Sequence, residues 1–117
     1  MWRDRENNMN FEAAPKSAVI EANYDDARFY CIGNIDDKTG WRLPTKDELN
    51  QLYNSSNGYG PEWYWTSTPY VVPHNPRFDN AVWVQNFRIG LQTYCLTDHN
   101  IPFEKYYVLP VRDLKAN

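Results

Sequence analysis

The stretch from residue 40 to residue 49, GWRLPTKDEL, constrains the fold of this chain more than any other. Gly40 permits the backbone angles that a turn often needs, and Leu43 precedes a proline, which favours an extended backbone. Thr45 is placed to cap a helix, and Glu48 three residues later completes a capping box. The sequence therefore predicts a turn, a short extended segment and the start of a helix.

The helix that follows this turn is expected to be amphipathic. Leu49, Leu52 and Tyr53 share one of its faces, and Trp41 and Leu43 are apolar enough to bury its beginning. Arg42 is then either exposed or buried beside an acidic partner, because an unpaired buried charge is very costly. We expect a structural role for the stretch, and a direct role in a binding site is the alternative.

Short motifs along the chain resemble those of a bacterial family. The central signature is carried by Trp41, Arg42, Leu43, Pro44, Thr45 and Glu48. Further motifs in the same order are W-x-D from Trp2, A-x-x-Y-C from Ala27, YWTST around Trp65, F-x-x-G from Phe87 and YVLPVR ending at Arg112. Together they resemble the domain of unknown function 1566 family, to which the C-terminal domain of the Legionella collagen-like adhesin belongs.

The resemblance implies a C-type-lectin-like fold. We therefore expect one α+β domain over residues 1–117, with two short helices packed on a twisted, mostly antiparallel sheet and with long loops. The RLPT piece is also similar to one in formylglycine-generating enzymes of the same fold class. Their paired reactive cysteines near the C-terminus are not found in this sequence. The resemblance implies much less about the ligand than about the fold.

Composition restricts the partners of the chain. With 117 residues it has room for one modest core, and its net charge of −3 argues against nucleic acid. No apolar run is long enough for membrane insertion, and the N-terminus has no secretory signal. The compartment stays open: extracellular or cell-surface if the domain belongs to a larger exported protein, and otherwise cytoplasmic. The 16% aromatic content suits both a small core and a binding surface.

The chain contains two cysteines, Cys31 and Cys95, which form either one disulfide or two separate buried thiols. Members of the resembling family often place a second cysteine in the closing strand. This chain has Leu109, Pro110 and Val111 there. The resemblance therefore supplies no partner for Cys31.

Hydrophobic patterning predicts the remaining elements. We expect an early strand or extended arm over 2–11, a helix within 17–31 with its strongest signal over 24–31, and a tail over 113–117. The expected strands are 63–67, 81–87, 91–96 and 105–112, with a hairpin turn at 88–90. Pro110 implies an edge position or a bulge in the last strand. The acidic loop 34–38 is read as a solvated turn, since it lacks the spacing of a calcium loop.

The strand over 63–67 should place Trp63 and Trp65 on one face and Tyr64 on the other. Core packing is the expected role of the two tryptophans, and a platform for stacking carbohydrate is the alternative.

Catalysis is poorly supported by the sequence. His74 and His99 are the only histidines, and neither lies in a recognised nucleophile motif. These two with Asp98 provide a conceivable metal site, but the usual spacing of zinc ligands is absent, so a polar turn is expected. There is no glycine-rich phosphate loop. We expect no enzymatic activity and no cofactor.

The remaining candidate is a binding surface on the late loops 69–80 and 97–104. Recognition usually falls on such loops in C-type-lectin-like folds, and loops held by a scaffold often carry function. The candidate ligand-binding residues are Tyr70, His74, Asn75, Arg77, Asp98, His99, Asn100 and Glu104. Aromatic rings with planar polar groups suit a glycan or a protein epitope. An ordinary solvated loop is the alternative for each residue.

Two hypotheses about function follow. The first is a non-enzymatic recognition or adhesion module of a bacterial or phage surface protein, with a homo-oligomer such as a trimer expected from the resemblance. The second is a small intracellular or phage-encoded protein that binds and blocks a partner protein. An enzyme related to the formylglycine-generating class is the least favoured reading.

Overall fold

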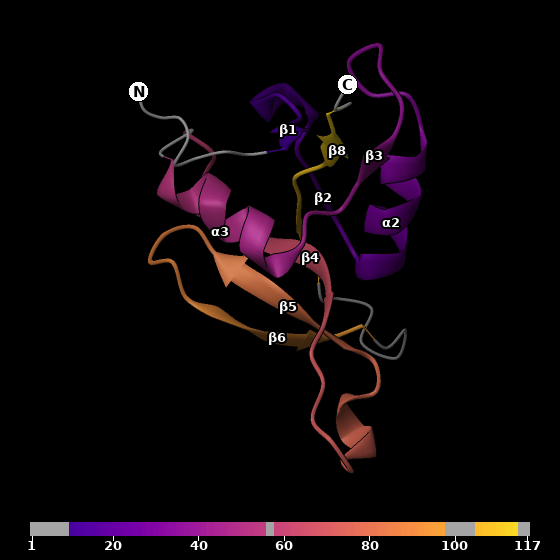
Figure 1. The fold of residues 1–117 in the computed structure, drawn as a ribbon, viewed down its shortest axis with the longest axis vertical. Helices are drawn as coiled ribbons and strands as arrows, with labels where there is room; N and C mark the ends of the chain where they lie inside the picture. The colour runs from indigo at the N-terminus through magenta and orange to yellow at the C-terminus, as the bar shows by residue number, and fades with distance from the viewer. Residues whose placement is uncertain (1–9, 56–57, 98–104, 115–117) are drawn as a thin grey trace.

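The computed structural model describes residues 10–55, 58–97 and 105–114, and the fold is α+β (Figure 1). Within these ranges the α-helices are α2 (Tyr24–Ile32) and α3 (Lys46–Asn54), and the 3-10 helices are η1 (Lys16–Ala18) and η2 (Pro76–Phe78). The strands are β1 (Phe11–Ala13), β2 (Ile20–Ala22), β3 (Trp41–Arg42), β4 (Trp63–Pro69), β5 (Ala81–Asn86), β6 (Gln92–Leu96), β7 (Tyr106–Val108) and β8 (Val111–Asp113).

The strands form two mostly antiparallel sheets rather than the single sheet that was expected. The three-stranded sheet has the order β1-β8-β3, and the five-stranded sheet has the order β2-β7-β4-β5-β6. Helix α2 packs against β2, β3 and β7, whereas α3 packs against β4 and β5. The first and last described strands, β1 and β8, are paired. The first and last described segments of the chain therefore lie side by side.

The closing segment differs from the predicted single strand over 105–112. Leu109 and Pro110 separate β7 from β8, and each of these two strands lies in the interior of its own sheet. The carbonyl of Pro110 accepts a hydrogen bond from the Ala14 N–H at 2.9 Å. Because proline has no N–H to give to a ladder, it stands where the chain crosses between sheets, not at an edge or a bulge. The predicted tail is also wrong at its start, because Asp113 belongs to β8.

The helix predicted within 17–31 is confirmed only in its second half. The first half forms η1 and β2, in which Ile20 pairs with Val108 of β7. Branched side chains favour strands, and the partner strand lies far away in the sequence. Asn23 then starts α2, since its side chain accepts a hydrogen bond from the Asp26 N–H at 2.8 Å.

The stretch over 40–49 folds as its residues predict. Gly40 has a φ of 87°, which suits a turn. The Thr45 hydroxyl accepts from the Glu48 N–H at 3.1 Å, and the Glu48 carboxylate accepts from the Thr45 N–H at 2.9 Å. Leu49 and Leu52 of α3 are buried. The turn, the extended segment and the capped helix are thus confirmed.

The two faces of β4 contribute to two buried clusters. Trp65 is 1% exposed and lies with Trp63 in the cluster that contains the buried residues of α2. Tyr64 lies in the other cluster, with Leu49 of α3. The predicted alternation is therefore confirmed. The indole N–H of Trp65 donates to the Ala22 carbonyl at 2.9 Å, so Trp65 is a core residue rather than a platform for carbohydrate.

The two cysteines are separate buried thiols, and the alternative of a disulfide is wrong. Cys31 and Cys95 are not joined by a disulfide and belong to the same buried cluster. Burial raises the pKa of the Cys31 thiol to about 11. A buried thiol of this kind is protonated at neutral pH and behaves as a small apolar side chain.

Both predicted turns are present. The acidic loop is tight, and Asp36 and Asp37 have positive φ angles of 56° and 60°. The hairpin turn 88–90 joins β5 to β6 and ends at Gly90, whose φ is 83°. A Cβ atom at this glycine would lie 2.7 Å from the ring of Tyr53. The glycine is therefore needed both for its backbone angle and for the close approach of α3.

Candidate binding site

Segment 69–80 connects β4 to β5 and extends away from the sheets (Figure 1). At its base, the Tyr70 N–H donates to the first carbonyl of β5 at 2.9 Å. Near its tip, the Asn75 side chain accepts from the Arg77 N–H at 3.2 Å and so caps η2. His74 is exposed and has a φ of 62°. The segment is held by these bonds, as expected of an ordered loop rather than a linker.

Four aromatic rings gather where this segment meets β5 and β6. We call Tyr70, Phe78, Trp83 and Tyr94 the aromatic platform. The ring of Tyr70 is central: its centroid lies 4.7 Å from that of Tyr94, 5.0 Å from that of Trp83 and 5.6 Å from that of Phe78. Phe78 and Tyr94 meet edge to face at 5.0 Å. Such distances are those of favourable aromatic pairs.

The platform lies outside both buried clusters of the protein. Tyr94 is 39% exposed, and the other three rings are partly exposed. Trp83 and Tyr94 stand directly opposite each other in the β5–β6 pair, so the sheet register fixes their positions. Rings that already pack on one another lose little freedom when a ligand covers their exposed parts.

Two cationic side chains border the platform. The ammonium nitrogen of Lys46 lies 4.5 Å from the centroid of Trp83, and the guanidinium carbon of Arg77 lies 5.8 Å from that of Phe78. Lys46 is the first residue of α3, and its N–H donates to the Thr68 hydroxyl at 2.8 Å. In the described part of the chain, neither cation forms an ion pair with a carboxylate. Both charges remain available to a ligand.

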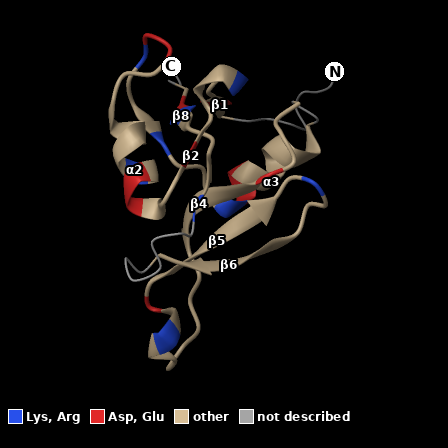
Figure 2. Cartoon of the chain, turned by 180° about the vertical axis from the view of Figure 1, so that it is seen from behind, with Lys and Arg blue, Asp and Glu red and all other residues tan. Residues whose placement is uncertain are grey.

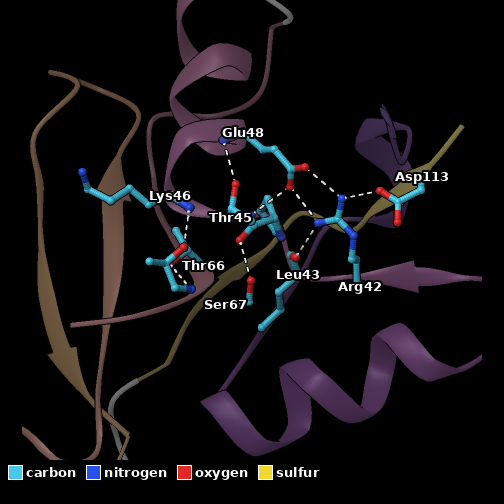
Figure 3. Close-up of polar contacts among 10 residues, drawn as sticks. Arg42, Leu43, Thr45, Lys46, Glu48, Thr66, Ser67 and Asp113 are labelled. Carbon is cyan, nitrogen blue, oxygen red and sulfur yellow. Dashed lines mark hydrogen bonds and ion pairs between the residues drawn. The ribbon is translucent and has the colours of Figure 1, made fainter. Parts of the chain in front are cut away.

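A contrasting polar arrangement, which we call the Arg42 network, joins Arg42, Thr45, Glu48 and Asp113. The guanidinium donates to both carboxylate oxygens of Glu48, at 2.7 and 2.8 Å, and to Asp113 at 2.6 Å (Figure 3). The hydrogen bonds from Arg42 lower the pKa of Glu48 and of Asp113. Arg42 is therefore partly buried beside acidic partners, and the network holds α3, β3 and β8 together.

A second ion-pair cluster supports the motif residue Arg112. Its guanidinium is paired with Glu12, and Lys38 approaches the same carboxylate at 3.3 Å. Its Nε donates to the Thr39 carbonyl at 3.0 Å, and the group lies 5.8 Å from the ring of Trp41. Arg112 thus links β8 to β1 and to the turn before β3, which is a structural role.

A pocket of about 280 Å³ lies between α2 and the signature stretch. It is lined by Tyr24, Arg28, Cys31, Ile32, Trp41, Arg42, Leu43 and Ser67. Phe29 and Ile32 lie one helical turn apart on α2 and are 75% and 74% exposed. Helix α2 therefore presents an apolar surface to solvent beside the pocket. Sequence reasoning missed this surface, although the spacing of the two apolar side chains was a signal for it.

Four of the eight predicted ligand-binding residues lie in the described part of the chain. Tyr70 is the centre of the platform, and Arg77 borders it. Asn75 uses its side chain to cap η2, and His74 is exposed on the same segment. The other four, Asp98, His99, Asn100 and Glu104, lie outside the described residues and stay predictions.

The other members of this surface were not predicted from the sequence. Trp83 and Tyr94 join Tyr70 through the pairing of β5 with β6, and Lys46 joins through the packing of α3 on β5. The alternating patterns of 81–87 and 91–96 indicated two strands of a hairpin. Pairing those strands from the predicted turn at 88–90 would have placed Trp83 opposite Cys95. In the structure Asn86 bonds to Leu91, and this register, shifted by one residue, places Trp83 opposite Tyr94.

Within residues 10–55, 58–97 and 105–114, no three His, Cys, Asp or Glu side chains gather in a way that could hold a metal ion. The helices of these same ranges are too short or too polar to cross a lipid bilayer. The chain matches no known family model, and it matches no curated protein.

Proposed function

We propose that this chain is a non-enzymatic recognition module that binds a saccharide through the aromatic platform. The observation that carries the proposal is the contact of Tyr70 with three other rings outside the buried clusters. The apolar face of a sugar ring stacks well on aromatic side chains, while its hydroxyl groups bond to nearby polar groups. The Lys46 ammonium and the Arg77 guanidinium border the rings and supply such donors.

The proposal includes a C-type-lectin-like fold and membership of the domain of unknown function 1566 family. Two features support this assignment. The signature residues fold as a turn, strand and capped helix held by the Arg42 network, and β1 lies beside β8. In such folds, recognition usually falls on long loops between late strands, and segment 69–80 is a loop of this kind.

A glycan array tests the proposal, because it samples many saccharides in one experiment. We expect the native chain to bind at least one class of saccharide, and Tyr70→Ala to weaken that binding about tenfold. Tyr53→Ala is the matched control: Tyr53 is also partly exposed and touches one ring, Phe87, near the turn of the hairpin at Gly90. No binding to any glycan, or equal losses in the two variants, would contradict the proposal.

The apolar surface of α2 favours a second candidate function, the binding and blocking of a partner protein by an intracellular or phage-encoded protein. Phe29 and Ile32 beside the 280 Å³ pocket form an anchor of the kind that protein interfaces use. Affinity capture with the native chain and two variants tests it. A partner retained by the native chain and by Ile89→Asp, but lost from Phe29→Asp, supports this candidate, since Ile89 is 66% exposed elsewhere on the molecule.

A further inference from the structure

The four edge strands in the described part of the two sheets differ in how well they are protected against pairing with another strand. Edges β1, β2 and β3 are two or three residues long, and each carries a charged side chain, namely Glu12, Glu21 and Arg42 respectively. Edge β6 has five residues, Gln-Thr-Tyr-Cys-Leu, with neither charge nor proline (Figure 2). Natural edge strands are usually protected by shortness, charge, proline or a bulge. Strand β6 has none of these, and its register with β5 is continuous.

The hydrogen bonds at the two ends of the β5–β6 pair show which backbone groups of β6 face outward. The Asn86 N–H donates to the Leu91 carbonyl at 2.8 Å, and the Thr97 N–H donates to the Asn80 carbonyl at 2.6 Å. Bonded residues alternate along an antiparallel strand, so 91, 93, 95 and 97 bond toward β5. The N–H and C=O groups of Gln92, Tyr94 and Leu96 therefore point away from β5, where no described strand pairs with them.

We infer that β6 pairs antiparallel with β6 of a second copy of the chain, about a two-fold axis at Tyr94. In this register the backbone of Tyr94 forms hydrogen bonds with Tyr94 of the second copy, and the backbone of Gln92 in each copy forms hydrogen bonds with Leu96 of the other. All the outward groups of the strand are then satisfied, and the two five-stranded sheets become one. We assign a second copy of the chain as the partner of β6. Because the strand carries no charge, two copies of it pair without placing like charges opposite each other.

This dimer would bring two aromatic platforms together, because Tyr94 belongs to the platform and lies at the axis. Residues directly opposite in an antiparallel pair point to the same face of the sheet. Both platforms would then face the same side, which suits a ligand with repeated units. The pairing itself does not depend on the proposed saccharide binding. It replaces the trimer expected from the family resemblance with a closed dimer.

Cysteine cross-linking tests the register directly. In a hydrogen-bonded pair the Cα atoms are about 5.5 Å apart, within the range of a disulfide. We therefore expect Tyr94→Cys to form a covalent dimer under mild oxidation, about tenfold faster than Glu21→Cys. Glu21 is the matched control because it is the middle residue of edge β2. The two native thiols are buried, so they add little to the cross-linking.

Sedimentation equilibrium of the native chain and its variants completes the test. We expect a dimer for the native chain and for Tyr94→Phe. Tyr94→Lys should weaken dimerisation at least about tenfold, because it places two ammonium groups opposite each other. Leu96→Pro should also weaken it, since it removes an outward N–H while leaving the ladder with β5 intact. Circular dichroism checks that each variant is folded.

Three results would overturn the inference. The first is a native chain that sediments as a monomer at every concentration, and the second is a trimer. The third is a dimer in which Tyr94→Cys cross-links no faster than Glu21→Cys, because that dimer would use another surface. A native chain that forms this dimer but binds no saccharide would instead count against the proposed function alone.

Discussion

The Arg42 network and the aromatic platform are both built on α3 and its neighbouring strands, but they use their polar groups in opposite ways. In the network, the guanidinium of Arg42 is satisfied by Glu48 and Asp113. At the platform, the cations of Lys46 and Arg77 rest on aromatic rings and have no carboxylate partner among the described residues. The four rings of the platform are exposed or partly exposed and lie outside both buried clusters.

This difference separates a surface that stabilises the fold from one that is open to a ligand. A satisfied charge network offers little to a ligand, because binding would first have to break its bonds. The rings of the platform are partly exposed, and their cations form no ion pair with any described carboxylate that a ligand would have to break. The signature residues on which the proposed family assignment rests therefore lie in the scaffold, and the proposed recognition surface lies beside them.

The largest expected effect on stability comes from Arg42→Met. The change leaves Glu48 partly buried and Asp113 without their cation, so we expect the free energy of unfolding to fall by about 2 kcal/mol. Urea denaturation at pH 7 measures it. Lys46→Met is the control and should change the same quantity by less than about 0.5 kcal/mol. Equal losses in the two variants would erase the distinction between network and platform.

Removal of a platform ring should affect binding more than folding. We expect Phe78→Ala to weaken binding of the best saccharide about tenfold, or about 1.4 kcal/mol, because Phe78 contacts both Tyr70 and Tyr94. Isothermal titration calorimetry measures the change. Phe29→Ala on α2 is the control and should bind like the native chain. A loss confined to the Phe29 variant would move the binding site to α2.

The helix cap of α3 should contribute less than Arg42. Thr45→Ala removes the oxygen that accepts from the Glu48 N–H, and we expect a loss of about 1 kcal/mol in the free energy of unfolding. Thr45→Ser retains the oxygen and should lose much less. If the serine variant is as unstable as the alanine variant, the methyl group of Thr45 matters more than the cap.

Acid should weaken the Arg42 network. The resulting loss in the free energy of unfolding should be similar to, or smaller than, the loss expected for Thr45→Ala. Arg42 holds the pKa of Glu48 below its ordinary value, so the unfolded chain takes up protons more readily than the folded chain as the pH falls. The stabilisation is complete above the ordinary carboxyl pKa and should be lost by about 1 kcal/mol between about pH 5 and pH 3. Thermal unfolding across this range measures it. Glu48→Gln should show a weaker acid dependence, and an unchanged dependence would assign the effect to other carboxylates.

The smallest expected effect is that of a reductant. Because Cys31 and Cys95 form no disulfide, addition of a thiol reductant should leave the melting temperature unchanged. Burial and the raised pKa of Cys31 should also make thiol labelling slow until the chain unfolds. A fall in melting temperature on reduction would show that the cysteines form a disulfide in solution.

The features that sequence reasoning predicted correctly depend on neighbours in the chain. The Thr45–Glu48 capping box and the alternation along β4 are local patterns of this kind. The failures involve partners far away in the sequence. Ile20 enters β2 because its partner is Val108, and a local helical pattern cannot report that pairing.

The candidate site was predicted in part for the same reason. Tyr70 and Arg77 lie on the loop 69–80, which was predicted from the sequence to be part of a binding surface. Their neighbours Trp83, Tyr94 and Lys46 come from two strands and a helix that meet only after the hairpin is paired. Residues of a surface assembled in this way cannot be read from one segment alone.

The most direct test of saccharide binding at the aromatic platform is a two-dimensional NMR titration of the isotope-labelled chain with the saccharide selected on the array. Binding at the platform should shift the signals of the Trp83 indole N–H and of the backbone around Tyr70 and Tyr94, and should leave the signals of Arg42 and Glu48 nearly unchanged. Shifts centred on the Arg42 network, or on Phe29 of α2, would contradict the proposed function and place recognition on a different surface.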